Sequence, residues 1–132
     1  MMIMIDRLIE QALLEDIHTG DITTKAVVPH RRPAEARLIA KEEMVVAGLS
    51  IAGRVFARLD PLVIFTPCLA DGESADKGTV LATICGDAAD LLVGERVALN
   101  LLQRMCGIAT LTSRFVSAVL GTKARIVDTR KT

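Results

Sequence analysis

Apolar side chains follow a helical spacing near the start of the chain. One face of a helix would collect Ile5, Leu8, Ile9, Ala12 and Leu13. Residues three and four apart lie on the same side of a helix, so the pattern predicts a helix over about residues 3–16. Residues 18–24 contain turn and capping residues without a helical period. We expect a loop there, in which Gly20 makes a turn and Asp21 caps.

The next part of the chain combines extended backbone with one short helix. Residues 34–47 alternate apolar and polar side chains imperfectly, which favours an extended conformation. Ser50 is a residue type that caps helices, so we expect a helix to begin there. The apolar side of this helix would consist of Ile51, Val55, Phe56 and Leu59.

Two strands and two turns are predicted beyond that helix. Residues 62–69 are rich in β-branched side chains but include Pro67, which cannot donate to a strand ladder. They therefore favour an edge strand. Residues 71–72 and 77–78 are turn sequences that end in glycine, and residues 79–85 predict a further strand.

The strongest helix signal covers residues 94–107. This segment is apolar on most sides, through Val97, Ala98, Leu99, Leu101, Leu102 and Met105. A helix of that kind is buried by more than one neighbour. Its one polar stripe consists of Arg96, Asn100 and Gln103, with Arg104 beside them.

Gly107 is expected to break or bend that helix. A second helix is predicted to continue to Leu120 and to end at Gly121, a usual stop residue. Its inward side would hold Leu111, Phe115, Val119 and Leu120. Residues 124–128 then predict a short strand. A helix followed by a strand is typical of a βα barrel, so we expect the polypeptide to continue past Thr132.

Charge and composition narrow the function classes. The 132 residues carry 16 basic and 16 acidic side chains, and the only aromatic residues are three phenylalanines. We therefore predict no nucleic-acid partner, because neither a basic field nor a base-stacking surface is present. No apolar stretch approaches the roughly 20 residues of a membrane span. Three scattered cysteines indicate a reducing compartment, and we expect a cytoplasmic protein.

The segment Asp128-Thr-Arg-Lys-Thr132 is the first candidate site. Two adjacent cations, Arg130 and Lys131, follow the predicted strand, with Thr129 before them. If this strand belongs to a parallel barrel, these residues lie at the rim where such folds place active sites. Arginine and lysine there could bind a carboxylate or phosphate. A solvated basic tail is the alternative.

The polar stripe is the second candidate. An unpaired buried guanidinium is costly, so Arg96 must reach solvent, an acid such as Glu95 or Asp90, or a bound anion. On the pattern alone, a solvent face or a structural ion pair is favoured over a bound anion. The acids of residues 15–21 match no calcium-loop spacing, so a structural role is favoured over a metal site. Cys106 is predicted to be a core residue rather than a nucleophile.

Several segments together resemble quinolinate phosphoribosyltransferases. The resemblance covers nearly the whole chain, in order and with matching spacing, at residues 15–24, 47–48, 71–72, 77–78, 95–110, 121–123 and 128–132. The most characteristic of these is the helix from Glu95 to Thr110. Two residues depart from the family pattern, which has a small residue at the position of His18 and a small hydroxyl residue at that of Cys106.

The resemblance implies an α+β fold, with an open-sandwich, hammerhead-like N-terminal domain followed by the first strand of a truncated α/β barrel. The N-terminal domain is expected to cover residues 1–107, and residues 108–132 are expected to begin the barrel domain. Helix 94–107 would pack at the boundary between them. The implied activity transfers ribosyl 5-phosphate from phosphoribosyl pyrophosphate to quinolinate. Decarboxylation then gives nicotinate mononucleotide, CO2 and pyrophosphate, with Mg2+ as cofactor, in NAD biosynthesis.

The same resemblance implies a homodimer with shared active sites. Arg96 would contact quinolinate in the neighbouring subunit, whereas Thr129, Arg130 and Lys131 would act in their own site. Further residues, including most ligands of Mg2+, are expected beyond Thr132, so residues 1–132 alone are expected to be inactive. The alternatives are a nicotinate phosphoribosyltransferase, the molybdenum-transport-associated homologue, or a non-catalytic dimerisation module.

Overall fold

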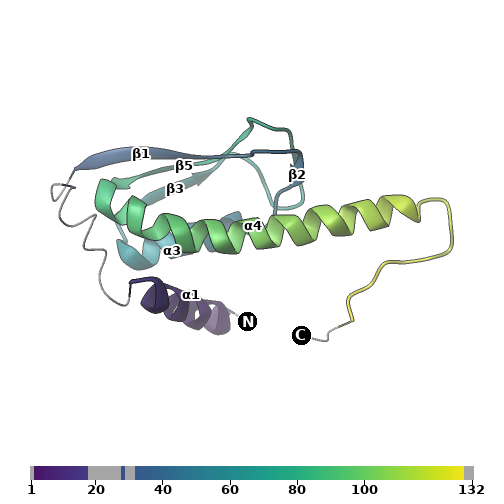
Figure 1. The fold of residues 1–132 in the computed structure, drawn as a ribbon, viewed down its shortest axis with the longest axis horizontal. Coiled ribbons are helices and arrows are strands. Elements are labelled where there is room, and N and C mark those ends of the chain that lie inside the picture. The colour runs from purple at the N-terminus through teal and green to yellow at the C-terminus, as the bar shows by residue number, and fades with distance from the viewer. Residues whose placement is uncertain (1, 18–27, 29–31, 130–132) are drawn as a thin grey trace.

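The computed structural model describes residues 2–17, 28 and 32–129. It is a mixed fold of helices and short antiparallel strands, as predicted (Figure 1). In chain order the elements are α1 (Met2–Ile17), β1 (Pro33–Ile39), β2 (Met44–Val45), α3 (Leu49–Leu59), β3 (Ile64–Pro67), β4 (Ser74–Ala75), β5 (Val80–Asp87) and α4 (Ala88–Ala118). The loop expected over residues 18–24, with its turn at Gly20 and cap at Asp21, lies outside the described residues.

Strand β5 forms the centre of a three-stranded antiparallel sheet in the order β1-β5-β3. Ala36 lies opposite Ile84, and Leu38 lies opposite Ala82. These inward positions alternate with exposed ones along β1, so the imperfect alternation in the sequence did identify the core face. The predicted edge strand with its proline is confirmed, because β3 lies at the edge and ends at Pro67.

The helices cover one face of this sheet. Figure 1 shows α3 and α4 beneath the strands and α1 on the side of these two helices away from the sheet. Ile9 and Leu13 of α1 join the same core as Val55 and Phe56 of α3. The helical face predicted for residues 3–16 is thus confirmed in its two most buried members, which are 1% and 6% exposed.

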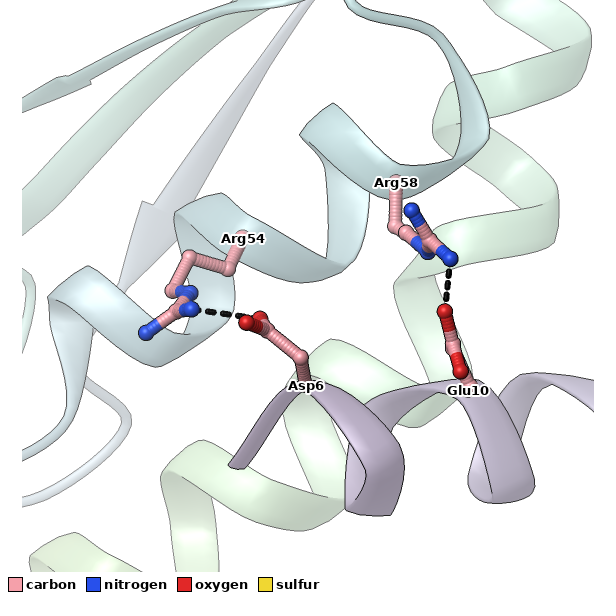
Figure 2. Close-up of polar contacts among 4 residues, drawn as sticks. All are labelled: Asp6, Glu10, Arg54 and Arg58. Carbon is pink, nitrogen blue, oxygen red and sulfur yellow. Dashed lines mark hydrogen bonds and ion pairs between the residues drawn. The ribbon is translucent and has the colours of Figure 1, made fainter. Parts of the chain in front are cut away.

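Two ion pairs add a polar connection between α1 and α3. Asp6 pairs with Arg54, and Glu10 pairs with Arg58 (Figure 2). The acids are four residues apart on α1 and the arginines four apart on α3, so successive turns of the two helices are matched. The four side chains are between 32% and 57% exposed. Ion pairs that are so accessible to water contribute little to stability, so these pairs align the helices more than they stabilise the fold.

The start of α3 differs from the prediction. The helix begins at Leu49 after Gly48, whose φ of 94° lies in the left-handed region, and Ser50 makes no capping bond. Instead the Asp71 carboxylate accepts a hydrogen bond from the Leu49 backbone N–H at 3.2 Å. The prediction was wrong because the cap comes from a turn 22 residues away in sequence.

Helix α4 is a single element of 31 residues, from Ala88 to Ala118. The break predicted at Gly107 is wrong, because one glycine costs a helix only about 1 kcal/mol and does not end it. The start predicted at residue 94 is also wrong. The helix begins six residues earlier, where the Asp87 carboxylate caps it by accepting from the Ala89 N–H at 2.9 Å.

The last part of the described chain lies apart from the sheet. Helix α4 extends beyond the strands, and residues 119–129 form turns and coil (Figure 1). The strand predicted over residues 124–128 is not formed, because none of the described strands lies beside this segment to complete a ladder. The predicted inward side of the second helix is also wrong for Leu111, Phe115 and Leu120, which are 53%, 55% and 74% exposed.

Candidate functional site

Arg96 lies on the solvent face of the buried half of α4. Its neighbours Val97 and Ala98 belong to the core, whereas Arg96 and the rest of the stripe are exposed, namely Asn100, Gln103 and Arg104. The stripe is therefore the polar face that the spacing predicted. The Arg96 side chain is accessible to solvent, with 73% of its surface exposed.

The partner of Arg96 is Asp16, not the acids named from the sequence. Arg96 Nη1 donates to Asp16 Oδ1 at 2.9 Å. Neither Glu95 nor Asp90, the acids expected from the sequence, forms a salt bridge with it among the described residues. The pair joins α4 to α1 across 80 residues of sequence. A pattern confined to one helix could not reveal it.

Asp16 is placed where local helix energetics disfavour an acid. It lies in the last turn of α1, which contains no basic residue. The negative end of the helix dipole disfavours a carboxylate there by about 0.3–1 kcal/mol. The side chain is also only 21% exposed, so it needs a partner more than a surface acid does. An acid at the C-terminal end of a predicted helix was the one signal in the sequence that pointed to it.

Of the other predicted site residues, Thr129 alone lies within the described residues, at their C-terminal end. Thr129 is exposed in the coil after α4, and no hydrogen bond joins it to Arg96. Arg130 and Lys131 lie outside the described residues. The cationic pair at residues 130–131 therefore stays a prediction.

Cys106 belongs to the core, as predicted. Its thiol is fully buried, accepts from the Ala47 N–H at 3.3 Å and donates to the Ala47 carbonyl at 3.4 Å. Burial raises the pKa of the Cys106 thiol, and the negative charge of Asp71 raises it further. The hydrogen bond with the Ala47 backbone lowers this pKa but does not cancel the rise. A protonated, buried thiol is a poor nucleophile, so this cysteine has a packing role.

A groove of about 430 Å³ lies between residues 38–44 and α4. Gln103 of the polar stripe lines it, together with Lys41 and Arg114, but Glu42 and Glu43 line it too. Because its charges are balanced, this groove has no evident preference for an anion. The exposed guanidinium of Arg96 is the stronger candidate for binding a carboxylate.

The described residues provide no metal cage and no membrane-spanning helix. Among residues 2–17, 28 and 32–129, no group of three or more His, Cys, Asp or Glu side chains is placed to hold a metal ion. His18 and His30 lie outside this part of the chain. No helix in the described ranges has the length and apolar character needed to cross a bilayer.

Comparison with known proteins identifies the fold and the family together. Residues 21–106 match the family described as quinolinate phosphoribosyl transferase, N-terminal domain. A probable nicotinate-nucleotide pyrophosphorylase (carboxylating) of Synechocystis is 45% identical over 131 residues, which are 98% of this chain and 44% of that protein. A probable enzyme of the same name in Bacillus subtilis is 42% identical over 96% of this chain and 43% of its own length.

Solved structures agree with this match. NadC from Streptococcus pyogenes superposes with a TM-score of 0.86 at 39% identity, covering 90% of this chain and 43% of that one. The nicotinate-nucleotide pyrophosphorylase from Francisella tularensis gives a TM-score of 0.90 at 32% identity, over 97% of this chain and 46% of that one. The chain spans less than half the length of these relatives, and it belongs to the quinolinate phosphoribosyltransferase family, whose N-terminal domain it contains.

Proposed function

We propose that the protein containing this chain is a decarboxylating quinolinate phosphoribosyltransferase. The ring nitrogen of quinolinate would attack the anomeric carbon of phosphoribosyl pyrophosphate. An N-glycosidic bond forms, and pyrophosphate leaves with the electron pair of the broken C–O bond. The carboxylate beside the ring nitrogen then leaves as CO2, and a proton replaces it on the ring carbon. The product is nicotinate mononucleotide, a precursor in NAD biosynthesis.

The exposed guanidinium of Arg96 is the observation that carries this proposal. It lies on the helix that resembles the family most closely, and among the described residues its one hydrogen-bond partner is Asp16. A guanidinium is planar and offers paired donors, so its open edge fits a carboxylate in bidentate fashion. Quinolinate has two carboxylates and therefore requires several such cations. Arg96 is proposed to bind one carboxylate.

The remaining site residues and the assembly belong to the same proposal. Thr129, Arg130 and Lys131 would line the site of their own subunit, with Arg130 and Lys131 as its cations. Arg96 would reach into the neighbouring subunit of a homodimer. The exposed apolar side chains of α4 after residue 107 support a further packing partner, because a monomer rarely leaves such a row uncovered.

Mg2+ is proposed to enter with phosphoribosyl pyrophosphate. Magnesium is usually held by substrate phosphates, water and one or two carboxylates rather than by a cage of protein ligands. The described residues gather no such group, so we assign no ligand of the ion to them. A cytoplasmic location fits the three free cysteine thiols.

The product assay tests the reaction. The protein expressed from its native reading frame is incubated with phosphoribosyl pyrophosphate, Mg2+ and either quinolinate or nicotinate. We expect nicotinate mononucleotide, CO2 and pyrophosphate in equal amounts from quinolinate. If only nicotinate gives product, the assignment of quinolinate as the substrate is wrong and the protein is a nicotinate phosphoribosyltransferase. No product from either would favour the molybdenum-transport-associated homologue or a non-catalytic dimerisation module.

A chain limited to residues 1–132 serves as the matched control. It retains Arg96 but only the beginning of the proposed barrel site. We expect no turnover from it, because the reaction needs cations from both parts. Turnover by this chain would contradict the proposed division of the site.

A further inference from the structure

We propose that Asp16 is a positioning residue for Arg96. In this inference, which rests on the proposed function, the Asp16 carboxylate holds one corner of the guanidinium so that its opposite edge is already directed at a substrate carboxylate. Asp16 itself does not contact the substrate. It lowers the loss of side-chain freedom that Arg96 suffers when the substrate binds.

The geometry of the pair leaves room for a second carboxylate. A guanidinium has five N–H donors in a rigid fork. A single bond of 2.9 Å connects Nη1 to Asp16 Oδ1, and 73% of the Arg96 side chain remains exposed. No described residue bonds the edge formed by Nε and Nη2, so this edge can bind a carboxylate in bidentate fashion while Nη1 stays with Asp16.

The two members of the pair differ in exposure. Asp16 is 21% exposed and is fixed by the last turn of α1, whereas the Arg96 side chain extends into solvent. The less mobile partner thus restrains the more mobile one. A long arginine side chain has many rotamers, so a restraint at its tip removes much of this freedom before a ligand arrives.

Two other acids of α1, Asp6 and Glu10, already connect this helix to α3. Asp6 and Glu10 pair with Arg54 and Arg58 of α3, and their side chains are 48% and 40% exposed. Asp16 is more buried, lies at the disfavoured end of the helix and points to α4 instead. Its position is better explained by Arg96 than by attachment of α1.

Two variants of Asp16 test the inference by steady-state kinetics, in the enzyme expressed from its native reading frame (the native-frame enzyme). Asp16→Asn keeps the shape but removes the charge, and we expect the KM for quinolinate to rise about 3–10-fold with little change in kcat. The KM for phosphoribosyl pyrophosphate should stay unchanged. Asp16→Glu retains the charge and should recover part of the loss. Glu10→Gln is the matched control, since it removes an α1 ion pair that does not involve Arg96, and it should leave both KM values unchanged.

A double variant shows whether Asp16 acts through Arg96. In an Arg96→Ala background, the further change Asp16→Asn should leave kcat/KM for quinolinate unaltered, because no guanidinium remains to be held. The same loss in both backgrounds would overturn the inference and indicate a structural role. Thermal melting of each variant identifies any that fails to fold, and Asp16→Glu then serves as the test.

The outcomes separate this inference from the function it rests on. If Arg96→Ala raises the KM for quinolinate but Asp16→Asn leaves it unchanged or lowers it, only the role of Asp16 is wrong. If Arg96→Ala has no effect on quinolinate, the proposed role of Arg96 is wrong and that of Asp16 falls with it. If the enzyme does not use quinolinate at all, the proposed function itself fails.

Discussion

The two halves of α4 share one helical backbone but have different surroundings. The stretch up to Cys106 contributes Leu91, Val97, Ala98 and Leu102 to the core, all at most 7% exposed. The stretch after it exposes Ile108, Leu111, Phe115 and Val116 by 43–62%. Both halves are rich in apolar residues, so composition does not separate them. What separates them is the sheet and α3, which lie over the first half, whereas α4 continues beyond the strands in its second half (Figure 1).

This difference shows that helix formation and burial are separate events. The backbone hydrogen bonds of a helix are local and continue wherever residues tolerate them. Burial requires a second surface. The apolar row of the second half is therefore helical without being buried among the described residues, whereas the first half is a core element that carries Arg96 on its exposed face.

The largest expected effect separates a buried leucine from an exposed one. Leu102→Ala removes a side chain that is 4% exposed and should lower the free energy of unfolding by about 2–5 kcal/mol. Leu111→Ala, at 53% exposure, should change it by less than about 0.5 kcal/mol. Urea unfolding of residues 1–132, followed by circular dichroism, measures both. Equal losses would mean that the second half is also covered in solution, which contradicts the comparison.

A pair of glycines on the same helix should give effects of opposite sign. A Cβ at Gly94 would lie 2.8 Å from Cδ1 of Phe56 and 3.0 Å from Cδ1 of Leu59, so Gly94→Ala should destabilise the fold by about 1–3 kcal/mol. A Cβ at Gly107 would meet no side chain or backbone atom of another element of the described chain within 4 Å. Gly107→Ala should therefore stabilise the fold by about 0.5–1 kcal/mol through helix propensity. Melting temperatures that shift in the same direction would refute this account of the two sites.

The smallest expected effect concerns the acidic start of α4. Burial, with Asp60 and Asp87 nearby, raises the pKa of the Asp90 carboxyl above its ordinary 3.8. The folded state therefore binds this proton more tightly than the unfolded state does. The contribution of protonated Asp90 to the free energy of unfolding is fully present below the ordinary pKa. It is lost as pH rises through the raised pKa of the folded state.

Asp90→Asn should accordingly stabilise the chain near neutral pH, by less than about 1 kcal/mol because the site is partly solvated. The gain should shrink to nothing when pH falls below about 3.8, where the native carboxyl is neutral too. Glu95→Gln, an exposed acid on the same helix, is the control. Melting curves at neutral and acid pH measure both variants, and a gain that grows towards acid pH would contradict the sign.

Local patterns predicted the elements, and long-range partners accounted for the errors. The apolar period of α1, the proline of β3 and the polar stripe of α4 each depend on residues that are close together in the sequence. The sequence was therefore sufficient to predict these features. The cap of α3 comes from Asp71, and the partner of Arg96 comes from Asp16, across 22 and 80 residues. Residues 124–128 have strand-like side chains, but strand formation depends on a neighbouring strand. No short sequence window contains that information.

The most direct test of the central claim is the specificity constant for quinolinate in Arg96→Ala, measured in the native-frame enzyme beside Arg58→Ala. Both arginines are exposed by more than half and pair with an acid of α1, but only Arg96 is proposed to bind the substrate. We expect Arg96→Ala to lower kcat/KM for quinolinate by about a hundredfold or more and Arg58→Ala to leave it within about twofold. Equal values for the two variants would contradict the assignment of Arg96 to the site.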